Sequence, residues 1–280
     1  MAEITAAAVG KLREMTNAGL MDCKKALAEA AGDLDAAVEI LRKRGVAQAA
    51  KKAGRETREG VIAQTIAPGG RTGVLVEIDC ETDFVAKNDT FRAFCDDVSR
   101  ALVTDPSADI EALRVAAVAK IGENIKVARH ARFDLTGPGL IAAYIHTGGK
   151  VGVLVEVGSG KEATTATEGF KQLVKDITLQ IAAASPTHVT RDAVPAAVVA
   201  KEREIAAQSD RLKGKPPQAL EKIVQGIVEK YYQTVCLVEQ GFVKDPDKTV
   251  GQHVEALGKQ LGDTLVIRRF LRWQVGEITA

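Results

Sequence analysis

Apolar side chains recur at the spacing of one helix face in two separate segments, residues 91–102 and 170–181. In both segments the apolar positions fall at i, i+3, i+4, i+7 and i+11, which predicts two helices that bury the same face. Each segment is preceded by two runs rich in β-branched residues, the first pair being GVIAQTIA and GVLVEIDC. A Pro-Gly-Gly sequence at 68–70 separates that pair, so a β-hairpin is predicted ahead of the helix.

These patterns belong to a duplicated unit. Residues 60–98 align without a gap on residues 139–177, and 13 of the 39 positions are identical, where chance gives about two or three. A second match, GENIKVARHARF at 122–133 with GDTLVIRRFLRW at 262–273, has an offset of 140 residues instead of 79. Each copy therefore ends in one more strand, and the second copy carries an insertion of 61 residues before that strand.

The insertion and the N-terminal segment both have helical patterns. Residues 195–207 and 218–234 predict an antiparallel helical hairpin with a tight turn at GKPP, 214–217. Near the N-terminus, helices are predicted at 5–15, 22–31 and 33–44. Thr5, Asp22 and Asp33 are the predicted N-caps, and Gly45 is predicted to end the third helix.

Together these elements predict an α+β protein, in which a three-helix bundle precedes two related subdomains with antiparallel three-stranded sheets. The predicted boundaries are 1–50 for the bundle, 51–59 for a linker, 60–136 for the first subdomain and 137–280 for the second, with the hairpin inserted at about 187–240. A chain of 280 residues is long enough for two or three such units.

Charge and hydropathy narrow the range of partners. Lys plus Arg (38) nearly balance Asp plus Glu (37), so no global field attracts the chain to nucleic acid or to an anionic membrane. No apolar run has the length of a transmembrane helix, and Glu3 stands where a signal peptide needs cations. We therefore expect a soluble cytoplasmic protein whose four cysteines, which form no CxxC pair, are reduced and mostly buried.

Motifs for nucleotide, metal or covalent chemistry are missing from the sequence. No GxxxxGK[ST] or GxGxxG occurs, which argues against direct nucleotide binding, and no histidine has ligand spacing to another histidine or to a cysteine. Cys80 lies beside Glu81 and Asp83, whose charges raise a thiol pKa instead of activating the thiol. We expect no cofactor, no bound metal and no enzymatic activity.

The two copies differ most between the second strand and the helix. The first copy reads ETDFVAKNDT at 81–90 and the second GKEATTATEG at 160–169, so Phe84 aligns with Ala163. Either Phe84 folds back onto the sheet while Asp83 caps a turn, or Phe84 is an exposed anchor for a protein partner. Since the second copy keeps its strand and helix without an aromatic, the scaffold does not require one, which favours the anchor.

A second docking candidate lies in the N-terminal bundle. In TNAGLMDCKKAL, residues 16–27, an Asn-Ala-Gly turn precedes Leu20 and Met21. These two side chains either form an exposed docking patch or close the small core of the bundle, and the sequence leaves both alternatives open.

Several of these segments resemble the bacterial elongation factor Ts family. The matching motifs are AGLMDCKKAL, AAKKAG, TDFVAKN, KIGENI and KTVGQ, and the resemblance extends over nearly the whole chain. It implies a guanine-nucleotide exchange factor for elongation factor Tu, acting in translation elongation. It also implies a UBA-like (ubiquitin-associated-like) N-terminal domain, two related core subdomains, and a projecting hairpin that serves partner contact or assembly into a dimer or heterotetramer.

The resemblance also assigns roles to residues of the TDFVAKN motif. Thr82, Asp83, Phe84 and Val85 match a segment that approaches the Mg²⁺ site of the GTPase. By this resemblance Phe84 would wedge between two helices of the GTPase, and Asp83 would help to displace the support of the ion.

Three further residues acquire partner-binding roles from the resemblance. Leu20 and Met21 match the part of the family that docks on the nucleotide-binding domain of the GTPase, with Met21 the stronger candidate. His146, in the second subdomain, is the candidate contact with another domain of the GTPase.

Two other classes of function remain open at this point. A ribosome- or RNA-associated binding module without exchange activity would depend on Arg268, Arg269 and Arg272, the only basic cluster on a predicted strand. Alternation along a strand predicts that Arg269 faces away from the other two. An enzyme would use Cys80 or Cys95 as its nucleophile, but the sequence indicates no substrate.

Overall fold

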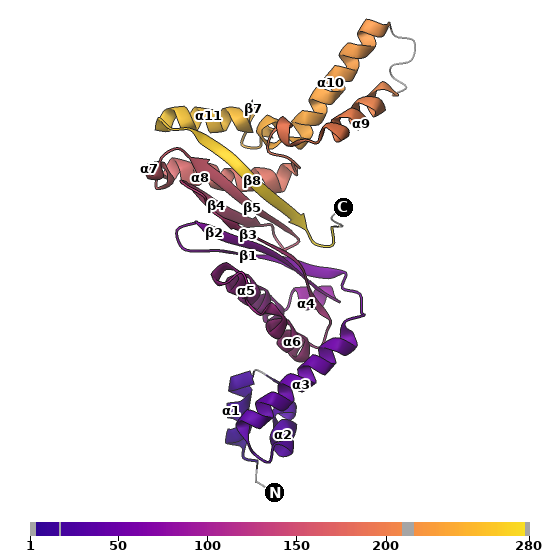
Figure 1. The fold of residues 1–280 in the computed structure, drawn as a ribbon, viewed down its shortest axis with the longest axis vertical. Coiled ribbons are helices and arrows are strands. Elements are labelled where there is room, and N and C mark those ends of the chain that lie inside the picture. Colours follow the sequence, from indigo (N-terminus) through magenta and orange to yellow (C-terminus); the bar gives the residue numbers. More distant parts are fainter. Residues whose placement is uncertain (1–3, 17, 209–215, 278–280) are drawn as a thin grey trace.

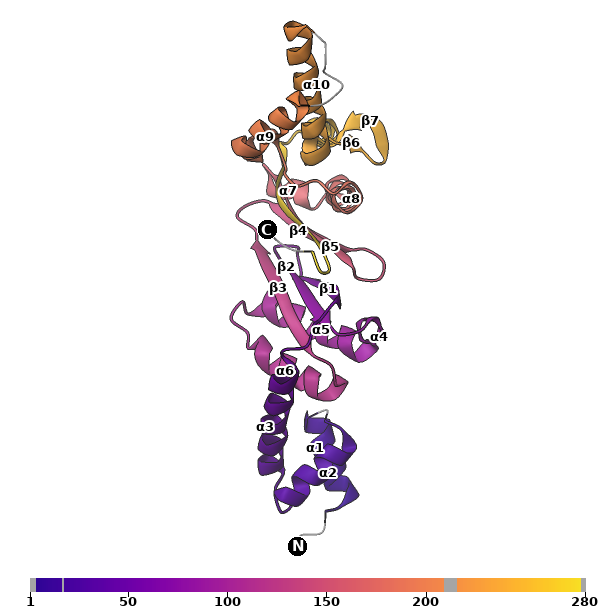
Figure 2. The same cartoon turned by 90° about the vertical axis from the view of Figure 1, so that its right-hand side faces the viewer.

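The computed structural model describes residues 4–16, 18–208 and 216–277. At its centre two three-stranded sheets lie face to face, and helices cover the outer face of each sheet (Figure 1). A three-helix bundle lies at one end of the molecule and a helical hairpin at the other, and the view in Figure 2 shows the same order of layers. The predicted α+β class is confirmed.

The two copies of the duplicated unit have the same order of elements. The first copy consists of β1 (Glu59–Ile66), β2 (Thr72–Cys80), α4 (Asp83–Ala86), α5 (Asp89–Thr104), α6 (Ile110–Ile121) and β3 (Ile125–Asp134). The second consists of β4 (Gly139–Ile145), β5 (Val151–Ser159), α7 (Glu162–Thr165), α8 (Glu168–Ala184), α11 (Val250–Leu261) and β8 (Leu265–Gln274). Both sheets are antiparallel, with β2 and β5 as their central strands.

Contacts between the sheets occur in reciprocal pairs. The N–H of Ile62 donates to the carbonyl of Gly149, and the N–H of Ile141 donates to that of Gly70, both at 2.7 Å. Ile62 and Ile141 are equivalent positions of the repeat, as are Gly70 and Gly149. The two copies are therefore related by an approximate twofold axis that passes between the sheets.

Two equivalent glycines allow the sheets to approach closely. Gly73 in β2 faces Ile141, and Gly152 in β5 faces Ile62. A Cβ on either glycine would collide with the Cγ2 methyl of the facing isoleucine, because each isoleucine side chain occupies the space above the glycine. Leu75 and Leu154 are fully buried in the same inter-sheet core.

Two buried carboxylates, one in each copy, occupy equivalent positions and are related by the same approximate twofold axis. Arg129 binds Glu77 at 2.6 Å, and Arg269 binds Glu156 at 2.7 Å. Each arginine also donates to a backbone carbonyl of the last strand of the other sheet, at 3.2 and 3.1 Å respectively. These pairs satisfy carboxylates that are only 3% and 2% exposed, which would otherwise carry a large desolvation penalty.

The N-terminal bundle consists of α1 (Ala6–Thr16), α2 (Leu20–Glu29) and α3 (Leu34–Lys52). The prediction that Gly45 ends the third helix is wrong, since α3 continues to Lys52. Gly45 is instead a point of close packing, because the Cγ1 atom of Val115 in α6 lies 3.3 Å from where its Cβ would stand. The extended helix thus packs the bundle against the first subdomain, and the division at residues 51, 60 and 137 stays a prediction.

The caps of the bundle helices agree only in part with the sequence pattern. Asp33 caps α3 as predicted, accepting a hydrogen bond from the N–H of Ala36 at 2.9 Å. The prediction for Asp22 is wrong, because α2 begins at Leu20 with Gly19 in the N-cap position. Asp22 lies in the first turn of the helix, where its charge complements the helix dipole.

Each copy contains a second helix that the periodicity did not predict, α6 in the first and α11 in the second. The sequence of α6, IEALRVAAVAKI, is apolar on several sides and presents no distinct stripe. Both helices end at a glycine with positive φ, Gly122 (91°) and Gly262 (61°). These glycines open the GENI and GDTL segments that defined the second match of the repeat.

The inserted hairpin consists of α9 (Ala196–Ala207) and α10 (Pro217–Val235), which confirms the two predicted helices. Residues 214 and 215 of the turn predicted at 214–217 lie outside the described residues. At the base of the hairpin are η1 (Arg191–Ala193), η3 (Leu237–Glu239), β6 (Gly241–Phe242) and β7 (Asp245–Thr249). The buried Gln240 donates to the carbonyl of Thr234 at the end of α10 (2.7 Å) and to that of Ala184 at the end of α8 (3.2 Å). The hairpin is therefore tied to the second subdomain.

Candidate partner-binding site

The TDFVAKN segment forms a short helix, α4, where the sequence suggested a loop. Thr82 is its N-cap, and its hydroxyl accepts a hydrogen bond from the N–H of Val85 at 3.3 Å. Ala86 is buried, and Val85 packs against the core of the first subdomain. Phe84 is 81% exposed, so it does not fold back onto the sheet. Of the two alternatives for this ring, the structure has the exposed one.

Asp83 is the charged neighbour of the exposed ring. Its carboxylate pairs with Lys87 at 2.7 Å, one helical turn further on, and its side chain is 48% exposed. The hydrogen bond from Lys87 lowers the pKa of Asp83, and the same pair raises the pKa of Lys87. At neutral pH the tip of α4 therefore presents an aromatic ring beside an ionised acid.

The base of α4 is held by one carboxylate from another part of the chain. Glu123 Oε2 accepts hydrogen bonds from the N–H groups of Glu81 (3.0 Å) and Thr82 (3.1 Å). Glu123 Oε1 accepts a third bond from the hydroxyl of Thr82 at 2.6 Å. Bonds to an ionised acceptor are the stronger kind in proteins, so the entry to α4 is firmly fixed.

The second copy has the same mount, by which we mean a short helix whose entry is fixed by a carboxylate, but it has no aromatic ring there. α7 occupies the position of α4, and Asp263, the equivalent of Glu123, accepts hydrogen bonds from the N–H groups of Gly160 and Lys161, both at 3.1 Å. Its third bond comes from the hydroxyl of Thr164 at 2.5 Å. The segment whose sequence differs most between the two copies therefore forms a short helix in both. They share the short helix and differ in what it presents.

Leu20 and Met21 occupy the first turn of α2 and are exposed, at 54% and 60%. The small core of the bundle is closed by other residues, among them Leu12, Cys23 and Leu27, which are fully buried. Of the two alternatives for these side chains, the exposed patch is the one observed.

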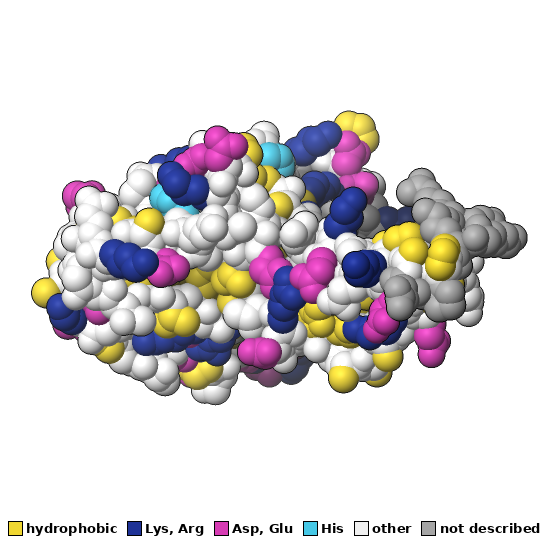
Figure 3. Space-filling model, turned by 90° about the horizontal axis from the view of Figure 1, so that it is seen from above, with side chains coloured by type: hydrophobic (Ala, Val, Ile, Leu, Met, Phe, Trp, Pro, Cys, Tyr) yellow, Lys and Arg dark blue, Asp and Glu magenta, His cyan; other side chains and the backbone are white. Residues whose placement is uncertain are grey.

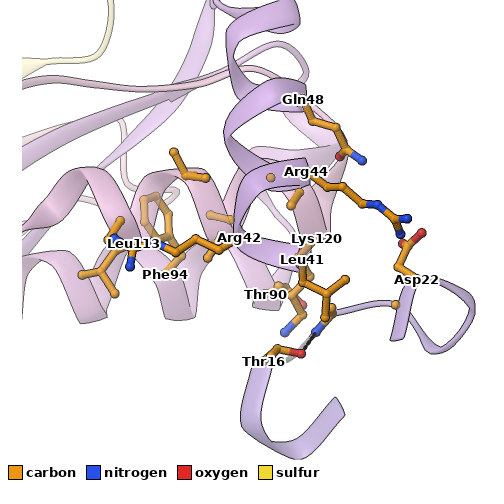
Figure 4. A pocket seen from close by; sticks show the side chains of 18 of the residues that line it. Thr16, Asp22, Leu41, Arg42, Arg44, Gln48, Thr90, Phe94, Leu113 and Lys120 are labelled. Carbon is orange, nitrogen blue, oxygen red and sulfur yellow. Dashed lines mark hydrogen bonds between the residues drawn. The ribbon is translucent and has the colours of Figure 1, made fainter. Parts of the chain in front are cut away.

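A cleft of about 720 Å³ lies between the bundle and helices α5 and α6, beside the contact of α3 with α6 (Figure 4). Leu41, Phe94 and Leu113 give it an apolar lining, and Asp22 and Lys120 are among its charged lining residues. Its wall includes the first turn of α5, which follows α4 directly in the chain. On the bundle side the lining includes Gly19 and Asp22, which flank Leu20 and Met21 in the chain.

His146 lies at the turn between β4 and β5 and is exposed. Its Nδ1 atom is 3.1 Å from the hydroxyl of Tyr144. The same turn contacts the helix that follows α4, because Arg92 in α5 donates to the carbonyl of Gly148 at 3.3 Å. The structure therefore brings the His146 turn beside the first turn of α5, the helix that follows α4 in the chain.

Comparison with known proteins shows the family of the chain. A family model described as Elongation factor TS matches residues 81–277. The chain is 44% identical over 290 residues to Elongation factor Ts of Trichlorobacter lovleyi, covering 98% of this chain and 93% of that protein. It is 45% identical over 284 residues to Elongation factor Ts of Symbiobacterium thermophilum (99% and 93% covered) and 44% identical over 294 residues to that of Chloroherpeton thalassium (99% and 100%). The chain belongs to the elongation factor Ts family. It is therefore a translation elongation factor.

In this elongation factor Ts family member two of the three arginines of the β8 cluster form ion pairs within the chain. Arg268 and Arg269 both bind the buried Glu156, at 3.0 and 2.7 Å. The expectation that these two arginines face opposite ways is wrong, because a register shift between Glu156 and Val157 makes Arg268 an extra, bulged residue. Figure 3 shows positive and negative side chains interspersed on the face at the hairpin end of the molecule. Neither observation favours an RNA-binding surface.

The two candidate nucleophiles are buried thiols. Burial raises the pKa of Cys80 to about 12, with Glu123 adding to the effect. Burial also raises the pKa of Cys95. Since the thiolate is the nucleophile, neither side chain is suited to covalent chemistry at neutral pH.

The described residues contain no group of three or more His, Cys, Asp or Glu side chains arranged to hold a metal ion. Within the same part of the chain, no helix is both long and apolar enough to cross a bilayer.

Proposed function

We propose that this protein is a guanine-nucleotide exchange factor that binds elongation factor Tu and promotes release of GDP so that GTP can bind. Family membership supports the partner, and the observation that carries the proposal is the ring of Phe84. An aromatic side chain that is 81% exposed on a firmly mounted helix costs solvation free energy in the free protein. That cost is recovered when the ring enters a pocket of a partner.

The energetic basis of exchange is linkage between two ligands of the GTPase. A factor that binds the empty GTPase more tightly than its GDP complex must weaken GDP binding by the same factor. No covalent bond is made or broken. Mg²⁺ and the phosphate-binding backbone hold the nucleotide jointly, so a wedge that moves the elements supporting the ion speeds nucleotide release.

The four residues of the motif divide into two roles in this mechanism. Phe84 and Asp83 project outward as the wedge and its acid, which would displace the support of Mg²⁺. Thr82 and Val85 hold the wedge, since the first caps α4 and the second packs on the core. Truncating Phe84 should therefore act on the rate of release more than on the fold.

Leu20, Met21 and His146 would supply affinity in this proposal. The two apolar residues on α2 would dock on the nucleotide-binding domain of the GTPase, and His146 would contact a second domain. Val198, Ile205 and Ile227 leave apolar surface exposed on the hairpin, which would serve assembly into a dimer or heterotetramer.

The test is release of a fluorescent GDP analogue from elongation factor Tu. Phe84→Ala should slow stimulated release by about 30-fold or more, which corresponds to a loss of about 2–4 kcal/mol, the range of aromatic hot spots. Ala163→Ser, at the equivalent position of α7, is the matched control and should leave the rate unchanged. Equal rates for wild type and Phe84→Ala would remove the wedge from the mechanism, and no stimulation by the wild type would refute exchange activity itself.

A further inference from the structure

Three consecutive residues, Gly122, Glu123 and Asn124, contact both the entry to α4, which carries Phe84, and the end of α3, the last helix of the N-terminal bundle. These residues connect α6 to β3. Glu123 makes the three hydrogen bonds to Glu81 and Thr82 that fix the entry to α4. Its carboxylate is thus the only side chain among the described residues that binds both backbone amides at that entry.

The neighbours of Glu123 bind the end of α3 and the residues that follow it. The ammonium group of Lys52, the last residue of α3, donates to the carbonyl of Gly122 at 2.7 Å. The side-chain amide of Asn124, which is only 4% exposed, donates to the carbonyl of Arg55 at 2.8 Å. The N–H of Asn124 donates to the carboxylate of Glu81 at 2.6 Å, which closes the connection to the base of α4.

We propose that Glu123 is a positioning residue for nucleotide exchange, and that the segment 122–124 holds Phe84 and the C-terminal end of α3 in a fixed position relative to each other. The inference rests on the proposed exchange function and adds the group that acts through the wedge. A ring on a loosely held helix must be ordered when it enters its pocket, and this ordering costs part of the binding free energy. A ring that is already held in position avoids this cost, so more of the binding free energy is available to move elements of the partner.

The second copy supplies a matched control for this proposal. Asp263 makes the two equivalent backbone hydrogen bonds at α7 and a third to the hydroxyl of Thr164, so its removal perturbs a similarly anchored helix that carries Ala163 instead of a ring. Glu123→Ala and Asp263→Ala should therefore cause similar losses of thermal stability. Only Glu123→Ala should affect exchange.

The experiment measures GDP release from elongation factor Tu at increasing concentrations of each variant. For Glu123→Ala the maximal rate should fall about tenfold, while the half-saturating concentration stays within about twofold. Glu123→Gln keeps a carbonyl acceptor for the two backbone amides and should restore most of the rate. Loss of rate in Asp263→Ala equal to that in Glu123→Ala would overturn the proposal.

A double variant separates positioning from general destabilisation. In the Phe84→Ala background, Glu123→Ala should cause no further loss of the maximal rate, because the group it positions is gone. A further tenfold loss would overturn the proposal. If Glu123→Ala does not fold at the assay temperature, Thr82→Val, which removes the hydroxyl partner, should lower the maximal rate about threefold, and an unchanged rate would again overturn it. Failure of the wild type to stimulate release would refute the proposed function and is a separate result.

Discussion

The short helices α4 and α7 have the same place, the same length and the same type of anchor, yet they present different surfaces. Each is four residues long, and each is fixed by a carboxylate that follows a left-handed glycine, Glu123 after Gly122 and Asp263 after Gly262. α4 exposes Phe84 beside an ionised acid, whereas α7 has Ala163 in that place. The comparison indicates that the short helix and its anchor belong to the duplicated scaffold, whereas the exposed ring is a feature of the first copy alone.

The largest effect should come from moving the ring between copies. In the double variant Phe84→Ala/Ala163→Phe, release of GDP from elongation factor Tu should stay about 30-fold or more below wild type, since the pocket for the ring must face α4 and not α7. Fluorescent GDP release checks this. Recovery of the wild-type rate of GDP release would contradict the comparison, because a ring on either short helix would then promote release.

The glycines between the sheets test whether the two copies are equally constrained. Gly152→Ala and Gly73→Ala should each lower the free energy of unfolding by about 1–3 kcal/mol through overpacking. The loss should be greater for Gly152, because its added Cβ would approach Ile62 more closely than that of Gly73 approaches Ile141. Urea denaturation measures both. Gly226→Ala in α10, where the space around the Cβ is open, is the control and should be neutral or stabilising. If Gly226→Ala lowered the free energy of unfolding by a similar amount, the effect would come from replacing glycine in the backbone and not from overpacking between the two sheets.

The exposed patch on α2 separates affinity from rate. Leu20→Ser combined with Met21→Ser should raise the half-saturating concentration for GDP release about tenfold, or about 1.4 kcal/mol, and leave the maximal rate unchanged. Phe84→Ala should do the reverse. If the α2 variant lowers the maximal rate instead, docking and wedging are not distinct steps.

The smallest effect concerns a position where the copies differ in charge. Asp79 in β2 has Gly158 as its equivalent in β5, and its Oδ1 atom is buried without a hydrogen-bond partner. Burial, with Glu77 adding to it, raises the pKa of Asp79 to about 6, above its ordinary value of 3.8. The folded state therefore binds a proton more readily than the unfolded state between those values, and ionisation of Asp79 destabilises the fold above pH 6.

Asp79→Asn should accordingly stabilise the protein at pH 8 by about 1 kcal/mol, once solvent screening of this partly buried group is allowed for. The gain should shrink through pH 6 and vanish below pH 4, where the carboxyl is protonated in both states. Unfolding by urea at pH 8, 6 and 4 tests the sign. A gain that grows as the pH falls would contradict it.

The sequence by itself determined the parts of the molecule in which local pattern and burial coincide. The duplication, the amphipathic helices α5 and α8, the hairpin helices and the Asp33 cap could all be read from spacing and residue type, because each depends on neighbours in the chain. It also favoured an exposed Phe84, since the aligned Ala163 showed that the scaffold needs no aromatic there.

Only the tertiary structure decided the rest, and the reason in each case is a contact distant in sequence. Gly45 does not end α3 because α6 packs against it, and Arg268 shares a carboxylate with Arg269 because the register shifts at that point of β5. The exposure of Leu20 and Met21 depended on which residues fill a core shared by three helices. Glu123 could have been suspected only from its alignment with Asp263, since the groups that it binds lie about 40 residues earlier in the chain. Local pattern fixes which residues can be buried, but the partner of a polar or glycine residue is chosen by the packing of whole elements.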